Sequence, residues 1–186
     1  MRTLLTAAFL ATAAFAGPPM ICHEVNIGSQ KSLPWGVSND WDNKLPSYDR
    51  ARLITDTLEL LKPEAEVLVR METLRRAAIY AGATPVASQL ADALRNRTGP
   101  LASFDAGYFI EAVHQLASIN KSDPLTGIDG YSLAKKSLAT ATDTAAVEYG
   151  LSLMQAHTNW PNEHFRKAKA GAKQGSLLAI NMRRLE

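Results

Sequence analysis

Residues 101–119, LASFDAGYFIEAVHQLASI, decide the fold of this chain. At about 100° per residue, their apolar side chains cover most of a helix surface. The polar side chains gather on one narrow strip, which contains Glu111, His114, Gln115 and Ser118. A helix that is apolar on nearly all sides is enclosed by its neighbours. The stretch therefore predicts the central helix of an all-α domain.

A second stretch of the same kind follows at about residues 143–155. Each of the two helices contains a glycine, Gly107 or Gly150, whose missing side chain allows another helix to approach closely. Aligning the two glycines gives an offset of 43 residues, which is near the period of repeats built from helix pairs. We therefore predict stacked antiparallel helix pairs in a repeat-like arrangement.

Six further helices are predicted around these two from capping and helix-breaking residues. We expect Ser47 to cap the first helix, Pro63 to lie in the first turn of the second, and Thr84-Pro85 to start the third. The other three begin near Gly130, at Trp160-Pro161 and after Gly175. Because no stretch alternates with the period of a strand, the prediction is an all-α fold of about eight helices.

The second predicted helix, about residues 63–81, also carries charged residues at regular spacing. Glu66 and Arg70 stand four residues apart, as do Glu72 and Arg76, with the acidic residue first in each pair. This order is the favoured one for i,i+4 ion pairs on a helix. The sequence predicts both pairs.

The segment 17–47 shows no sustained period and is rich in proline, glycine, asparagine and aspartate, which favour turns. Four large apolar residues within it, Ile27, Leu33, Trp35 and Trp41, are too many for a solvated linker. We therefore expect an irregular segment that wraps a helical domain comprising residues 48–186.

Residues 1–16 have the features of a secretory signal peptide. Arg2 provides the positive charge, an apolar run extends from Leu4 to Phe15, and Ala14-Phe15-Ala16 fits a cleavage site. The run is shorter than the roughly 20 residues that a membrane-spanning helix needs. We expect an exported protein, periplasmic or extracellular, with no membrane span after signal cleavage.

Charge and motifs exclude several classes of function. The formal net charge is +2, too small to favour nucleic acid as a partner. No phosphate-binding loop, dinucleotide fingerprint or nucleophile elbow is present, so no cofactor is expected. Glycosylation sequons at Asn96 and Asn120 would be used only in a eukaryotic source.

Cys22 is the only cysteine and His23 follows it directly. A lone cysteine in an exported chain can be a buried structural residue, form an intermolecular disulfide, or act as a thiol in catalysis or metal binding. His23 is a poor base for it, because adjacent side chains diverge in extended chain. The pair is thus a weak catalytic candidate, and burial is the favoured interpretation.

Histidines elsewhere give weak metal candidates. His157, Glu163 and His164 would supply three ligands, the least that a zinc site needs, if the intervening turn brought them together. Glu111 and His114 have the Glu-x-x-His spacing of carboxylate-bridged metal bundles, but such bundles need a second copy and none is present. Packing or solvation is the favoured explanation of these residues, so no metal is expected.

Trp35 and Trp41, with Asn39, Asp40 and Asp42 between or beside them, are weak binding candidates for a sugar. Aromatic side chains in a wrapping segment also serve to fill grooves between helices. Groove filling is the favoured interpretation, and sugar binding stays open as the alternative.

The motifs Cys22-His23, Ile27-Gly28 and Lys31-Ser32-Leu33-Pro34-Trp35 resemble the start of an uncharacterised family of exported bacterial proteins. The stretches 72–77 and 104–108 add to this resemblance, which covers about a fifth of the chain. It implies export and a helical-repeat body. It supplies no catalytic residues.

The sequence as a whole favours an exported scaffold that binds a protein or peptide, since no complete catalytic set is present. The first alternative is a small metal- or thiol-dependent hydrolase that uses Cys22 and His23 or His157 and His164. The second is cell-wall glycan binding through Trp35 and Trp41. Oligomeric state does not follow from the sequence.

Overall fold

The computed structural model describes residues 20–38, 40–155 and 160–185, and within these ranges the chain is all-α, with eight α-helices and no strand. The predicted fold class is thus confirmed. The predicted signal peptide, residues 1–16, and His157 lie outside the described residues. The helices are α1 (Leu53–Leu60), α2 (Val67–Ala81), α3 (Pro85–Arg95), α4 (Ala102–Asn120), α5 (Gly130–Lys135), α6 (Thr144–Met154), α7 (Glu163–Gly171) and α8 (Leu177–Arg183).

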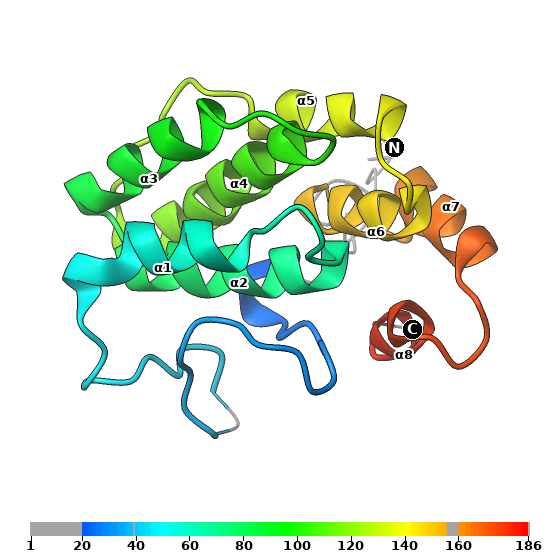
Figure 1. Ribbon diagram of the computed structural model, residues 1–186, viewed down its shortest axis with the longest axis horizontal. Coiled ribbons are helices and arrows are strands. Elements are labelled where there is room, and N and C mark those ends of the chain that lie inside the picture. Colours follow the sequence, from blue (N-terminus) through cyan, green and yellow to red (C-terminus); the bar gives the residue numbers. More distant parts are fainter. Residues whose placement is uncertain (1–19, 39, 156–159, 186) are drawn as a thin grey trace, which may run out of the picture.

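Helix α4 is the centre of the fold, as its apolar surface predicts. It packs against α2, α3, α5 and α6 (Figure 1). Phe104, Tyr108 and Phe109 on this helix have no exposed surface. Consecutive helices also pack in pairs, α4 with α5 and α6 with α7.

The two glycines allow the close approach that the sequence predicts. A Cβ atom on Gly107 would lie 2.2 Å from the carbonyl oxygen of Gly130, at the start of α5. A Cβ atom on Gly150 would lie 2.7 Å from the ring of Phe104. Glycine is therefore required where α4 meets α5 and where α6 meets α4.

Helix α2 differs from its prediction in two ways. It begins at Val67, and Pro63 lies before it in a turn closed by the Ala65 amide and the Lys62 carbonyl. It is also buried on nearly every side, charged residues included, because the N-terminal segment covers the face that the other helices leave open. Of the two predicted ion pairs, Glu72–Arg76 forms, whereas Arg70 pairs with Asp105 rather than Glu66.

Side-chain caps set the start of four of the eight described α-helices. Asp129, Asp143, Asn162 and Ser176 each accept a hydrogen bond from a backbone amide in the first turn of α5, α6, α7 and α8. The cap predicted at Ser47 is wrong, since Asp49 caps the short 3-10 turn that precedes α1. Helix α3 starts at Pro85 as predicted.

The N-terminal segment wraps the helices along α2 and reaches α8 (Figure 1). Leu33 is fully buried, Ile27 is buried, and Trp35 and Trp41 are partly buried against the core. The backbone amide and carbonyl of Asn26 pair with the side chain of Asn181 on α8, at 2.7 and 2.8 Å. The segment thus ties the two ends of the described chain together.

Across the part of the chain that the structure describes, no helix combines the length and apolar character needed to cross a membrane.

Candidate functional site

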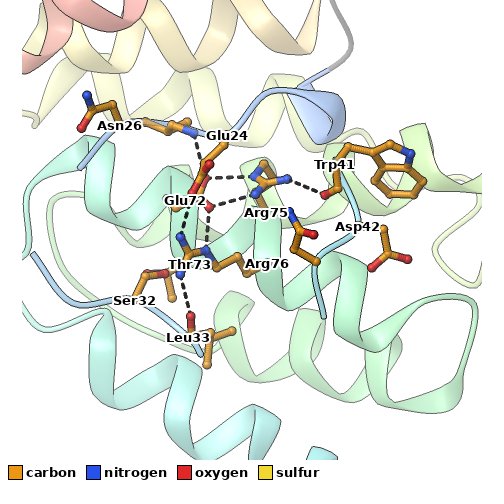
Figure 2. Close-up of polar contacts among 12 residues, drawn as sticks. Glu24, Asn26, Ser32, Leu33, Trp41, Asp42, Glu72, Thr73, Arg75 and Arg76 are labelled. Atoms are coloured by element: carbon orange, nitrogen blue, oxygen red, sulfur yellow. Dashed lines mark hydrogen bonds and ion pairs between the residues drawn. The ribbon is translucent and has the colours of Figure 1, made fainter. Parts of the chain in front are cut away.

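A buried cluster around Glu72 holds the N-terminal segment on α2 (Figure 2). Glu72 has no exposed surface, and its two carboxylate oxygens accept bonds from Nε and Nη2 of Arg75, both at 2.9 Å. The backbone amide of Val25 donates to the same carboxylate at 2.9 Å. One carboxylate therefore fixes both its own helix neighbour and a residue 47 positions earlier in the chain.

Arg76 extends this cluster toward the surface. Its Nε donates to Glu72 at 2.6 Å, its Nη1 to the carbonyl of Leu33 at 2.7 Å, and its Nη2 to Glu24 at 3.2 Å. Charge-assisted bonds of this kind are stronger than neutral ones. Figure 2 shows that Glu72, Arg75 and Arg76 contact three separate parts of the N-terminal segment.

The structure places Trp35 beside this cluster. The guanidinium carbons of Arg75 and Arg76 lie 5.2 and 5.5 Å from its ring centroid, within the range of cation–π attraction. Tyr80 meets the same ring edge-on at 5.6 Å. In Trp41, by contrast, the backbone carbonyl accepts from Arg75 at 3.3 Å, while the ring points away from the cluster (Figure 2). These contacts favour packing for Trp35 over a sugar platform shared by both rings.

Cys22 and His23 lie at the start of the segment. Cys22 is exposed, which differs from the burial that the sequence favours. Partial desolvation raises the pKa of its thiol, against the opposing charge of Arg75, and lowers the pKa of His23, where Arg75 acts in the same direction. A reactive thiolate needs a lowered pKa. The environment of Cys22 therefore opposes thiol catalysis.

A second buried chain of hydrogen bonds joins α5, α6 and α7. His164 on α7 contacts the Glu148 carboxylate through Nδ1, and its Nε2 lies 2.7 Å from the hydroxyl of Tyr131. Glu148 and His164 are buried, and Tyr131 is half-buried. The order carboxylate, imidazole, hydroxyl is that of a relay in which the histidine can accept the hydroxyl proton.

These hydrogen bonds bear on the predicted metal ligands. Both ring nitrogens of His164 have partners, and Glu163 is exposed and pairs with Lys167 at 2.7 Å. Within the ranges 20–38, 40–155 and 160–185, no three His, Cys, Asp or Glu side chains gather in a way that could hold a metal ion. His157, the third predicted ligand, lies outside the described residues.

His114 has protein partners as well. Its Nδ1 lies 2.7 Å from Asp123 and its Nε2 lies 2.9 Å from the carbonyl of Ile128. Glu111, three residues earlier, accepts from the backbone amide of Tyr131 at 3.0 Å. The two side chains of the Glu-x-x-His motif thus hold the loop after α4 and the start of α5 against α4.

Asp105 on α4 lies between two arginines. Its Oδ2 accepts from Arg70 at 2.6 Å and from Arg97 at 2.9 Å, and the arginines also donate to the carbonyls of Lys62 and Leu61. Its Oδ1 is buried and has no hydrogen-bond partner among the described residues. Burial outweighs the two positive charges and raises the pKa of Asp105 to about 6.

A groove of about 670 Å³ opens where the first turns of α2, α6 and α8 converge. It is lined by apolar side chains, including Val67, Leu68 and Leu177, and by polar ones, including Thr144 and Lys173. Asp143 and Ser176 cap α6 and α8 with their own side chains, but α2 has no side-chain cap. The first residues of α2 therefore line the groove without a side-chain acceptor for their backbone N–H groups.

Sequence reasoning missed Arg75, Tyr131 and Glu148 as members of buried clusters. A signal was present for Glu148, since it is the one charged residue on a helix that is otherwise apolar almost all round. Buried charges are almost always paired. A charged residue on such a helix therefore predicts a partner from another element, although the sequence does not name it.

The fold and these clusters define an all-α protein with paired internal charges and a groove of mixed lining. No family model matches the chain, and no curated protein or solved structure is significantly similar to it. The resemblance of residues 22–35 to exported bacterial proteins stays a prediction, as does export itself.

Proposed function

We propose that the protein is a binding scaffold whose groove between α2, α6 and α8 takes an extended peptide segment of another protein. The observation that carries this proposal is the convergence of three helix N-termini on one groove of about 670 Å³. A volume of this order falls within the range of ligand sites, and the mixed lining is typical of them.

The chemistry of the groove favours a peptide backbone over an acidic group. The carboxylates of Glu66 and Asp143 lie at the groove beside a single lysine, Lys173, and so disfavour a ligand that carries a negative charge. A peptide carbonyl carries no net charge and can accept from the uncapped first turn of α2. Apolar side chains of the same segment would pack on Leu68 and Leu177.

A display experiment tests this proposal. A phage library of random heptapeptides is panned on the purified chain, and enriched peptides are assayed against two variants. Thr144→Trp puts a large ring at an exposed position in the groove, and Thr126→Trp puts one at an exposed loop position elsewhere. We expect enriched peptides rich in apolar residues that lose binding to Thr144→Trp and keep it for Thr126→Trp.

Hydrogen exchange gives an independent readout. If a peptide carbonyl caps α2, the amides of residues 67–69 exchange more slowly in the complex. No enrichment, or binding that Thr144→Trp leaves unchanged, contradicts the proposal.

A second candidate function, an acyl-transferring or hydrolytic enzyme, is favoured by the relay at Tyr131. In this reaction the Tyr131 oxygen attacks the carbonyl carbon of an ester, and Nε2 of His164 takes the phenolic proton. Glu148 stabilises the resulting imidazolium, and the alkoxide or phenolate leaves as the acyl group bonds to Tyr131.

The probe for this activity is p-nitrophenyl acetate. We expect release of p-nitrophenolate together with an acetyl group that peptide mapping places on Tyr131, and loss of both in Tyr131→Phe. Tyr48→Phe is the matched control, because the Tyr48 hydroxyl bonds to a carboxylate, Asp56, at 3.0 Å. If Tyr131 acquires no more acetyl than Tyr48, the relay is structural.

A further inference from the structure

A small polar cavity of about 320 Å³ lies between the N-terminal segment, α2 and the end of α8. It is lined by residues 24–28, Gln30, Arg76 and Arg184. Its walls are almost entirely polar. Such a cavity suits an ionic ligand, since an apolar one would gain little by burial there.

The charges around the cavity do not balance inside the protein. The cationic residues that line the cavity are Arg76 and Arg184, and the anionic one is Glu24. Arg76 pairs with the buried Glu72 and with Glu24, whose side chain is 59% exposed and whose contact with Arg76, at 3.2 Å, is the longest that Arg76 makes. An exposed pair of this kind is weak.

Arg184 adds a second positive charge at the cavity. It is exposed and forms no ion pair with any residue in the described ranges. With Glu24 turned toward solvent, the charged residues that line the cavity are two cations, Arg76 and Arg184. Two guanidinium groups match the charge of a phosphate dianion.

We propose that this cavity binds a doubly charged oxyanion, such as a phosphate group, between Arg76 and Arg184, and that Glu24 occupies the site when the anion is absent. The anion accepts from Nη2 of Arg76, the atom that Glu24 now contacts. Arginine suits this role because its fixed N–H groups match phosphate geometry. The site is separate from the groove proposed for peptides.

Calorimetric titration with inorganic phosphate tests the proposal, at constant ionic strength and a pH near 7.5. We expect Arg184→Gln to weaken binding about tenfold or more, as the loss of a charge-assisted bond does. Glu24→Gln removes the competing carboxylate and should tighten binding about two- to fivefold, the equivalent of an exposed ion pair. Arg183→Gln is the control, because it removes the same charge from the neighbouring exposed position.

Three results would overturn the proposal. Phosphate fails to bind, Arg183→Gln weakens binding as much as Arg184→Gln does, or acetate binds as tightly as phosphate. The last result would show a site for a single carboxylate rather than for a dianion. Melting temperatures of all three variants should match that of the parent chain, because each changed side chain is largely exposed.

Discussion

Glu72 and Arg75 form a two-point ion pair one helical turn apart on α2, with both N–O distances at 2.9 Å and essentially no exposed surface on either side chain. Burying two charges is costly unless every charged atom has a partner. Here the partners come from the N-terminal segment, through the Val25 amide and the Trp41 carbonyl. The buried ion pair is therefore stable only when the N-terminal segment is in place, and the segment is held in place by the ion pair.

Replacing Glu72 by glutamine should destabilise the fold by about 3–5 kcal/mol, because it leaves the guanidinium group of Arg75 buried without its carboxylate. Urea denaturation measures the loss. Limited proteolysis should also cut between residues 25 and 41 sooner than in the parent chain. Glu59→Gln, at an exposed position on α1, is the control and should change stability by less than about 0.5 kcal/mol.

Trp35→Ala should cost about 2–3 kcal/mol, less than the full loss of a buried tryptophan because the ring is only partly buried. The ring packs on Tyr80 and lies beside two guanidinium groups. Val37→Ala, in the same segment but fully exposed, serves as the control. A melting temperature that Trp35→Ala leaves unchanged would show that the segment is held by its polar contacts alone.

The all-α class and the central position of α4 could be predicted because they follow from local periodicity. The charged clusters could not, because their partners lie far apart in sequence: Arg70 pairs with Asp105, and Glu148 with His164. Periodicity assigns a charged residue to a face of its own helix and carries no information about what covers that face. The true start of α2 was missed for a similar reason, since Arg70 also bonds the carbonyls of Lys62 and Ala65 in the turn before the helix.

Asp105 should make stability fall as pH rises. Its pKa is 3.8 in its ordinary environment and about 6 in the fold, so the folded state binds the proton more tightly than the unfolded state does. The contribution is complete below about pH 4 and is lost as pH rises through 6. The shift of about two units corresponds to about 3 kcal/mol.

The measurement compares the parent chain with Asp105→Asn, which cannot titrate, by urea denaturation from pH 4 to 7. The stability of the parent relative to the variant should decrease across this range. An increase instead would mean that Arg70 and Arg97 outweigh burial and hold the pKa of Asp105 low.

His114 should contribute in the same direction at higher pH. Burial lowers its pKa, but the Ile128 carbonyl, Asp123 and Glu111 together raise it above 6.5. Its stabilising effect is therefore present below about pH 6.5 and lost as pH rises through the folded pKa. Relative to His114→Gln, the parent chain should lose stability as pH rises above 6.5. Relative to His23→Gln, the parent should instead gain stability as pH rises toward 6.5, because the pKa of His23 is lowered.

Gly150→Ala should destabilise the fold by overpacking, typically about 1–3 kcal/mol, because its new Cβ would lie 2.7 and 2.8 Å from two ring atoms of the fully buried Phe104. The ring can be removed, so Phe104→Leu should relieve the clash. In a double-mutant cycle, the pair should cost less than the sum of the single changes by about 1 kcal/mol or more. Additive costs would show that the ring of Phe104 does not limit the approach of α6 to α4.

Gly107→Ala should behave differently. Its Cβ would lie 2.2 Å from the Gly130 carbonyl oxygen and 2.5 Å from the Ala134 amide nitrogen, both backbone atoms of α5. No side-chain substitution removes these atoms, so relief requires α5 to move away from α4. Such a movement would break the bond between Glu111 and the Tyr131 amide. We expect a larger loss of stability than for Gly150→Ala, and no rescue by Phe104→Leu. Equal losses of stability for the two alanine variants would mean that displacing α5 costs no more free energy than displacing the ring of Phe104.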